Sequence, residues 1–235
     1  MLKYEKIANE IEQYIYDNNL PQGTKLPTVE NFASKYGVSK STIVKALESL
    51  VLKGIVYQLQ GSGIFVRRRN LSGYIDLSTT TGFTSTLKDF NITSKVLELK
   101  LINPDNEIAS FLECDTSDEV YMIKRIRYID NEIMCYEESY YKKSVVPYLN
   151  KEIVQGSIFE YLRNALNLNL GFSDRYFHID KLDDNLADLL ELNCGDPSLT
   201  MLEQIYLSSG LLFNFSKITY HYKHTQFFSQ SSAIK

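Results

Sequence analysis

Apolar positions recur with helical spacing over the first fifty residues of the chain. Residues 4–18 carry apolar side chains three and four positions apart, which predicts an amphipathic helix. A second helix is expected over 28–36 and a third over 39–53, with Thr28 and Ser39 as their N-caps. Both of these segments are short, and each keeps an apolar face toward the first.

The pattern then changes from helical spacing to alternation. Residues 55–60 and 64–66 flank Gly61-Ser62-Gly63, which predicts a β-hairpin with a glycine-rich tip. Three helices followed by a hairpin is the order of a winged helix-turn-helix, which binds DNA. The alternative is a small helical module for protein contacts, with Arg67, Arg68 and Arg69 as a solvated linker.

In a winged helix-turn-helix, the third helix places its first turn in the major groove, and its exposed amides favour phosphate oxygens. At the hairpin tip, the glycines would let the backbone approach the minor groove. The predicted DNA-binding residues are therefore Thr28, Ser39, Lys40, Ser41, Thr42, Lys45, Gly61, Ser62 and Gly63.

Charge is distributed unevenly along the chain. The formal net charge is −4, yet residues 1–70 hold ten Lys and Arg against six Asp and Glu. The remainder holds fifteen against twenty-three, so only the first segment is suited to meet a polyanion. The three cysteines have no metal-ligand spacing, and neither a membrane span nor a secretion signal is evident. We therefore expect reduced thiols, a cytoplasmic location and no membrane partner.

The first segment resembles the helix-turn-helix of the GntR family of transcription regulators. The matching motifs are Gly23-Thr24-Lys25-Leu26-Pro27, Gly37-Val38-Ser39-Lys40-Ser41-Thr42-Ile43, Ala46-Leu47 and Gly61-Ser62-Gly63-Ile64-Phe65-Val66. Three positions depart from the family's pattern: Glu30, Lys40 and Val44 stand where arginine is usual. Neither Glu nor Val can make an arginine's contacts, and a lysine offers one point charge instead of a fork. We therefore expect an unusual operator or contact pattern, with Lys45 as a replacement phosphate contact.

The remainder of the chain mixes strand and helix signals. After a polar linker at 67–81, strands are expected at 96–101, 120–128, 133–141, 199–207 and 211–222, and helices at 157–168 and 184–192. This order predicts an α+β sheet domain with long hairpins. The expected domains are thus 1–66 for DNA binding and 82–235 for effector binding and dimerisation, joined by the linker.

The second segment resembles the UTRA domain of the HutC subfamily of GntR regulators, whose antiparallel sheet with helices is similar to chorismate lyase. The shared features are the strand Lys124-Arg125-Ile126-Arg127-Tyr128, the strand with Tyr136-Glu137-Glu138-Ser139-Tyr140, the helix start Ser157-Ile158-Phe159, the spacing from Leu192 to Leu199 and the last strand through Ser216 and Tyr220. The resemblance implies a small-molecule effector, often a phosphorylated sugar.

Two arginines are the leading candidates for effector binding. Arg125 and Arg127 lie two positions apart on one strand and so share a face, where they repel each other unless an anion or carboxylate lies between them. Glu137 on the next strand either accepts sugar hydroxyls or pairs with an arginine. Ser157 is either an anion ligand or only an N-cap. The full predicted set is Thr84, Ser85, Arg125, Arg127, Glu137, Ser157, Asn214 and Tyr220.

Some members of that set come from the resemblance alone. The family places a phosphate-binding loop at Thr84 and Ser85, and it often has glutamate at the position of Asn214 and tyrosine at that of Phe159. These departures imply a ligand with different hydroxyl demands from an amino-sugar phosphate.

The resemblance implies a repressor that a phosphorylated sugar releases from double-stranded operator DNA. Because one winged helix contacts few base pairs, specific binding needs two half-sites, so a homodimer is expected. An activator and a ligand acting as corepressor remain open. An enzyme is the second hypothesis and rests only on the likeness to chorismate lyase. A DNA-binding protein without a ligand is the third. No catalytic residue, cofactor or metal is expected, and the three histidines are interpreted as surface or core residues.

Overall fold

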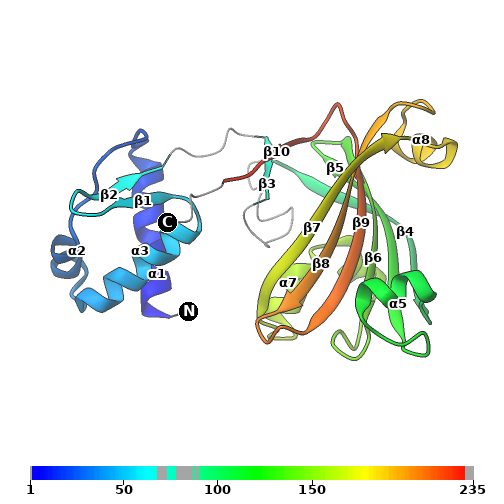
Figure 1. Ribbon diagram of the computed structural model, residues 1–235, viewed down its shortest axis with the longest axis horizontal. Helices are drawn as coiled ribbons and strands as arrows, with labels where there is room; N and C mark the ends of the chain where they lie inside the picture. The colour runs from blue at the N-terminus through cyan, green and yellow to red at the C-terminus, as the bar shows by residue number, and fades with distance from the viewer. Residues whose placement is uncertain (1, 68–72, 78–86, 88–89, 231–235) are drawn as a thin grey trace. The chain divides into compact units, whose positions relative to one another are not determined.

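The computed structural model describes residues 2–67, 73–77, 87 and 90–230. The chain forms two compact units (Figure 1). The first comprises Met1–Ser72 together with Ser229–Lys235, and the second comprises Gly73–Phe228.

The first unit has the helices and the hairpin that the pattern predicts. Its elements are α1 (Lys3–Asp17), α2 (Val29–Tyr36), α3 (Lys40–Leu52), β1 (Val56–Leu59) and β2 (Gly63–Val66). Gly37 ends α2 in the left-handed conformation with φ 61°, which a residue with a side chain adopts only under strain. The predicted α+β fold class with an N-terminal winged helix-turn-helix is confirmed.

An apolar core fixes the direction of α3 in this unit. Ile11 of α1 and Phe32 of α2 pack with Ile43, Leu47 and Leu50 of α3, and all five are buried. Burial of this stripe leaves the opposite side of α3 exposed to solvent. The start of α3 is therefore held rigidly by residues that make no contact with solvent.

The second unit is built around strands. Its elements are β3 (Tyr74–Asp76), β4 (Ile92–Ile102), α5 (Asn106–Leu112), β5 (Val120–Ile129), β6 (Glu132–Lys142), α6 (Lys151–Gln155), α7 (Ile158–Asn164), β7 (Leu170–Lys181), α8 (Asp184–Leu190), β8 (Pro197–Leu207), β9 (Leu212–Tyr220) and β10 (Gln226–Phe228).

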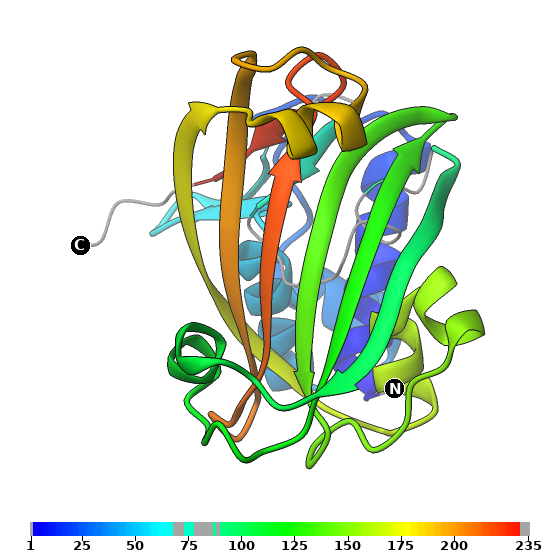
Figure 2. The same ribbon diagram turned by 90° about the vertical axis from the view of Figure 1, so that its right-hand side faces the viewer.

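Six of these strands form one antiparallel sheet, in the order β4-β5-β6-β9-β8-β7 (Figure 2). The hairpin between β5 and β6 turns at Asp130-Asn131, and both residues have positive φ, as a tight hairpin turn requires. Pairing of β6 with β9 joins two hairpins that are distant in the sequence. This pairing puts β6 and β9 in the middle of the sheet, with β4 and β7 at its edges.

Helices cover both faces of the sheet. On one face, α6 and α7 pack with Ile123 and Tyr141. On the other, α5 packs with Tyr140 and Phe215, and α8 packs close to Tyr136. Because neighbours along a strand point to opposite faces, the alternation of Tyr140 and Tyr141 fits this division.

Several elements differ from the pattern-based prediction. The helix expected over 157–168 begins at Ile158 and ends at Asn164, and α5, α6 and β7 were not predicted. The linker expected at 67–81 contains β3, so the second unit begins at Gly73 and not at residue 82. Strand β3 has three residues and pairs in parallel with β10 near the end of the chain. A strand that short has no periodicity to detect, because only its distant partner makes it a strand.

Candidate DNA-binding and effector-binding sites

Three hydroxyl groups cluster at the start of α3. Ser39 caps the helix, since its Oγ accepts a bond from the Thr42 backbone N–H at 3.3 Å. The same Oγ lies 2.9 Å from Ser41 Oγ and 2.9 Å from Thr42 Oγ1. Ser39 and Ser41 are exposed and Thr42 is half-buried. The helix start therefore presents polar groups of a size and chemistry suited to base edges and phosphates.

Lys40 is joined to Glu30 in the same region. Its Nζ lies 2.7 Å from Glu30 Oε1, and the two side chains are 65% and 60% exposed. The hydrogen bond from Lys40 lowers the pKa of the Glu30 carboxyl. The sequence identified both residues as departures from the family pattern but did not indicate that they contact each other, because they lie on different helices.

The other predicted DNA-binding residues lie on the surface of the first unit. Thr28 caps α2 and is exposed, as is Lys45 on α3. At the hairpin tip, the exposed Gly61 and Gly63 have φ of 74° and 120°. A Cβ at Gly63 would lie 3.0 Å from Lys25 Cε, so Lys25 lies against the tip. The sequence did not single out this lysine as a binding residue, because the contact arises only when the hairpin folds over it.

A cluster of buried polar side chains lies on one face of the sheet in the second unit. It comprises Arg125, Arg127, Glu137, Ser139, Asn214 and Ser216. Strand register places Arg125 opposite Glu137 and Ser139 opposite Ser216, so these side chains share a face. We call these six residues the buried polar cluster.

The centre of the cluster is an ion pair. Arg125 Nη2 donates to both Glu137 oxygens, at 2.7 and 2.8 Å, and its Nη1 donates to the Val154 carbonyl at 2.7 Å. Arg127 Nη1 lies 3.7 Å from Glu137 Oε2. The Ser139 hydroxyl donates to Glu137 at 2.7 Å. Of the two roles considered for Glu137, the structure shows the pairing with an arginine.

Burial and neighbouring charges both act on these groups. Burial alone would raise the pKa of Glu137, but the charges of Arg125 and Arg127 outweigh it and hold that pKa below its usual value. Burial would lower the pKa of Arg125, but its neighbours, chiefly the charge of Glu137, outweigh burial and raise that pKa above its usual value. For Arg127, burial and then repulsion from Arg125 lower the pKa. One carboxylate thus lies between two guanidiniums at this centre.

The remaining predicted effector residues fall into three groups. Asn214 is fully buried and donates to the Tyr140 carbonyl at 3.0 Å, and Tyr220 is fully buried with its hydroxyl 3.9 Å from Met201 Sδ. Ser157 caps α7 by accepting a bond from the Glu160 backbone N–H at 3.3 Å. Thr84 and Ser85 lie outside the described residues.

A second, partly buried ion pair extends the same face toward the sheet edge. Arg175 Nε lies 2.7 Å from Glu203 Oε1, and register places Glu203 opposite Ser216. Arg175 Nη1 also donates to the Leu77 carbonyl at 2.6 Å. Sequence reasoning missed this pair, because it did not predict β7, and without that strand Arg175 had no assigned face.

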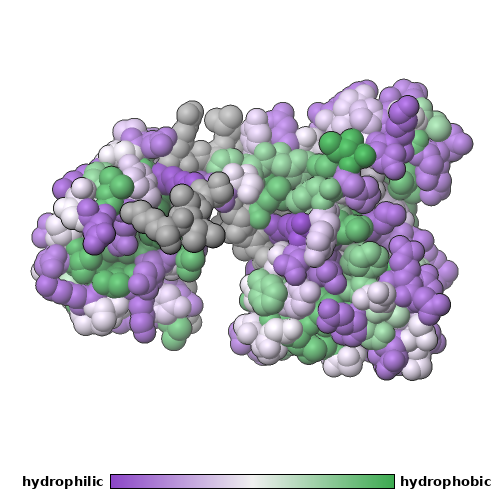
Figure 3. All heavy atoms as spheres, in the orientation of Figure 1, coloured by the Kyte–Doolittle hydropathy of each residue, from purple (hydrophilic) through white to green (hydrophobic). Residues whose placement is uncertain are grey.

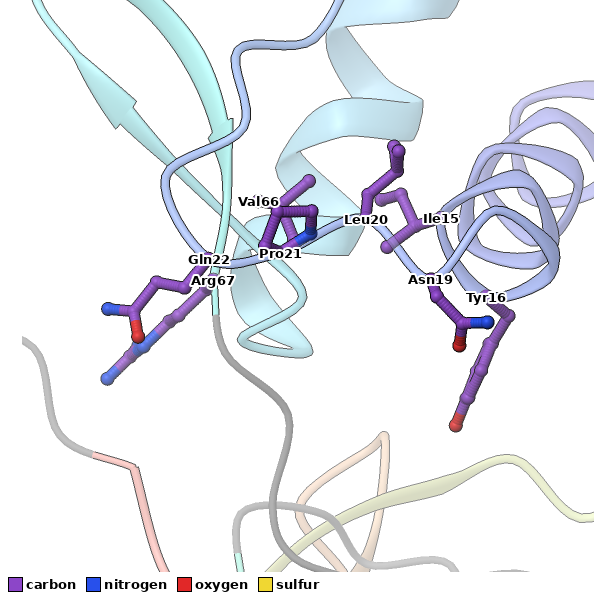
Figure 4. Close-up of a pocket in the computed structure, with 8 residues that line it drawn as sticks. All are labelled: Ile15, Tyr16, Asn19, Leu20, Pro21, Gln22, Val66 and Arg67. Carbon is purple, nitrogen blue, oxygen red and sulfur yellow. The ribbon is translucent and has the colours of Figure 1, made fainter.

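A hollow of about 530 Å³ lies in the first unit, between the end of α1 and the end of β2 (Figure 4). Tyr16 and Asn19 line one side of it, and Gln22 and Arg67 line the other. None of the predicted DNA-binding or effector-binding residues lines this hollow. It therefore adds nothing to either candidate site.

Within the described ranges, the histidines do not form a metal site. His178 is exposed, His221 is buried and His224 is half-buried. No group of three or more metal-ligating side chains occurs in the part of the chain that the structure describes. In the same residues, no helix has the length and apolar character needed to cross a membrane.

Comparison with known proteins agrees with this architecture. Residues 3–66 match the gntR family of bacterial regulatory proteins, and residues 88–226 match the UTRA domain. The HTH-type transcriptional regulator YydK of Bacillus subtilis is 47% identical over 100% of this chain and 99% of its own length. This chain belongs to the GntR family of transcription regulators. It is a DNA-binding regulator and not an enzyme, and the second unit of this GntR regulator is a UTRA domain.

Solved structures and more distant relatives support the assignment. The crystal structure of YydK has a TM-score of 0.89 and 46% identity, covering 99% of this chain and 100% of that one. The mannosyl-D-glycerate transport/metabolism system repressor MngR of Escherichia coli is 26% identical over 94% of both chains. The transcriptional repressor NagR of B. subtilis is 26% identical, over 92% of this chain and 89% of its own.

The buried ion pair yields a prediction about stability. Glu137→Gln removes the carboxylate that pairs with Arg125 and lies 3.7 Å from Arg127, so the buried charge of Arg125 loses its partner carboxylate. We expect the free energy of unfolding to fall by about 3 kcal/mol, measured by urea denaturation. Glu119→Gln, which breaks the exposed pair with Lys143 at 2.8 Å, is the control and should have a far smaller effect. Equal losses in the two variants would contradict the importance of burial.

Proposed function

We propose that this GntR regulator is a homodimeric repressor in the cytoplasm and that a small phosphorylated metabolite, a sugar phosphate, releases it from its operator. One observation carries the effector proposal: the Nε of Arg125, in the buried ion-pair centre, has no hydrogen-bond partner among the described residues. A buried guanidinium N–H of this kind is a donor suited to an anion. The names of MngR, a repressor of mannosyl-D-glycerate metabolism, and of the trehalose repressor TreR support a sugar derivative.

The chemistry of the cluster favours a phosphate. The Arg125 Nε is buried and has no hydrogen-bond partner in the described structure, so this arginine has donor capacity left. Guanidinium groups bind phosphate oxygens through paired N–H donors in a fixed plane. The hydroxyl oxygens of Ser139 and Ser216, 2.8 Å apart, offer further acceptors on the same face. An anion with hydroxyl groups beside it would match this set.

Edge strand β7 supports the homodimer. Its outer edge pairs with no other strand among the described residues, and it exposes four large apolar or aromatic side chains: Phe172, Tyr176, Phe177 and Ile179. Figure 3 shows hydrophobic residues interspersed with hydrophilic ones on this face of the second unit, where β7 lies in front in the matching view of Figure 1. The other edge strand, β4, has its bulge near the middle, between Val96 and Glu98, whereas the register shift of β7 lies near its start, between Leu170 and Ser173. A bulge in the middle of an edge strand discourages edge pairing. We infer that β7 pairs with its copy about a two-fold axis, which suits an operator with two half-sites.

Release follows from a difference in affinity. An effector that binds better to the arrangement of the dimer that cannot hold DNA shifts the population toward that arrangement. The coupling between effector and DNA equals that difference in affinity, and it acts in both directions. Operator DNA should therefore weaken effector binding by the factor by which effector weakens DNA binding.

Lys40→Ala tests the proposed DNA contact. Loss of the ammonium leaves Glu30 facing a polyanion without its partner, so operator affinity should fall about tenfold or more. Effector affinity, measured by calorimetry, should not change because the substitution lies in the other unit. Operator binding is measured by gel shift on the gene's own upstream DNA. Equal operator affinity in variant and wild type would contradict the placement of α3.

Arg127→Gln tests the proposed effector contact. Arg125→Ala is the less informative change, because it also removes the bonds to Glu137 and Val154 that support the fold. Arg127→Gln removes one guanidinium from the cluster, while the pair of Arg125 with Glu137 is retained. In gel shifts titrated with hexose 6-phosphates, inorganic phosphate and free hexoses, the wild type should be released only by a phosphorylated sugar. The variant should need at least about tenfold more ligand, and release at an unchanged concentration would contradict the assignment.

Ile179→Lys tests the proposed dimer. This side chain is 78% exposed on β7, and a charge there should prevent pairing with a copy of the same strand. Sedimentation analysis should give a dimer for the wild type and a monomer for the variant. Leu97→Lys, on the opposite edge strand β4, is the matched control and should remain dimeric. Dissociation of the control alone would place the dimer contact on β4 instead.

A further inference from the structure

The ion pair between Lys40 and Glu30 lies at the proposed DNA-binding surface of the first unit. We propose that the two side chains act together as one reading unit that recognises a single G·C base pair in the major groove of each half-site. The inference rests on the proposed placement of the first turn of α3 in that groove. It goes further by giving Glu30 a role of its own and by naming the base pair.

The position of the pair supports this role. Lys40 is the first residue of α3, and Glu30 lies in the first turn of α2, so the bond joins the starts of the two helices of the helix-turn-helix. The first helix of this motif crosses the DNA backbone while the start of the second enters the groove. Both side chains are exposed by more than half, so neither is held by the core. Their contact gives the ammonium and the carboxylate a defined spacing.

That spacing matches one edge of a G·C pair. Guanine presents two acceptors, N7 and O6, and cytosine presents one donor, its N4 amino group. O6 and N4 are hydrogen-bonded to each other in the base pair, so they lie about 2.9 Å apart. Lys40 Nζ and Glu30 Oε1 are 2.7 Å apart. The ammonium can donate to guanine while the carboxylate, which has lone pairs beyond the one used by Lys40, accepts from cytosine.

The other base pairs fit less well. An A·T pair in the same orientation places the adenine amino group before the ammonium and the thymine O4 before the carboxylate, so both contacts are repulsive. A T·A pair offers one acceptor and one donor in the right order, but a methyl group takes the place of guanine N7 beside the ammonium. We therefore expect G·C first, T·A second and the other two pairs last.

The Lys40–Glu30 pair carries no net charge. It therefore adds nothing to the electrostatic affinity of the protein for DNA phosphates, and its effect on base preference can be measured separately from that affinity. Glutamine in place of Glu30 keeps the size of the side chain but frees the ammonium for phosphate. Its amide is both donor and acceptor, so it no longer rejects the wrong base pair.

The test is an enrichment of full-length protein on random 30-base-pair duplexes, with wild type and Glu30→Gln in parallel. The matched control is Glu12→Gln, which breaks the ion pair of the same unit between Glu12 and Lys53 (3.0 Å), at the far end of α3. Wild type and control should enrich the same motif. The variant should keep that motif except at one G·C pair in each half-site, where the preference for G·C should fall at least about fivefold.

A second measurement uses a duplex without the motif at several salt concentrations. In Glu30→Gln, the freed Lys40 should steepen the slope of log binding constant against log salt concentration by about one unit per protomer. In Glu12→Gln, that slope should not change. An unchanged motif in Glu30→Gln would overturn the proposal, and so would an equal loss at all positions. If the wild type itself enriches no motif, the proposed regulatory function fails as well, which is a result distinct from either of these.

Discussion

The ion pair between Arg125 and Glu137 is the constraint on which the larger unit depends. Both side chains are buried in the middle of the sheet, where an unpaired charge is very costly. Their contact requires the observed register of β5 and β6, because a slip of one residue would turn one of the two side chains to the other face. The bond from Arg125 to the Val154 carbonyl then ties α6 to the same point. One pair thus fixes strand register and the position of a covering helix.

The two units place their polar groups in opposite ways. In the first, the predicted DNA-binding side chains at the starts of α2 and α3 are exposed or half-buried, and the apolar core beneath them holds the helices in place. In the second, the charged groups are themselves in the interior, and hydrogen bonds compensate their desolvation. DNA is a large ligand that meets a surface, whereas a small anion is bound most selectively where water is excluded. The difference in burial therefore agrees with DNA as the ligand of the first unit and with the small anion proposed for the second.

The polar face of the sheet is also connected to the segment that follows the DNA-binding unit. Arg175, paired with Glu203 on this face, donates to the carbonyl of Leu77, directly after β3. Strand β3 in turn pairs with β10 near the end of the chain. Hydrogen bonds thus join the polar face to β3, at the start of the second unit, and through it to β10 at its end.

The sequence by itself determined the first unit almost completely. Its helices, caps and hairpin depend on local signals such as Thr28, Ser39 and Gly37, whose effect reaches only a few residues along the chain. For the second unit, the alternation of Arg125 and Arg127 was enough to place both on one face. The partners of those side chains were decided only by the tertiary structure. The contacts of Glu30 with Lys40 and of Arg175 with Glu203, like the pairing of β3 with β10, join segments whose sequences carry no sign of each other. They form because packing of the whole unit brings those segments together, and a local sequence pattern does not predict such long-range contacts.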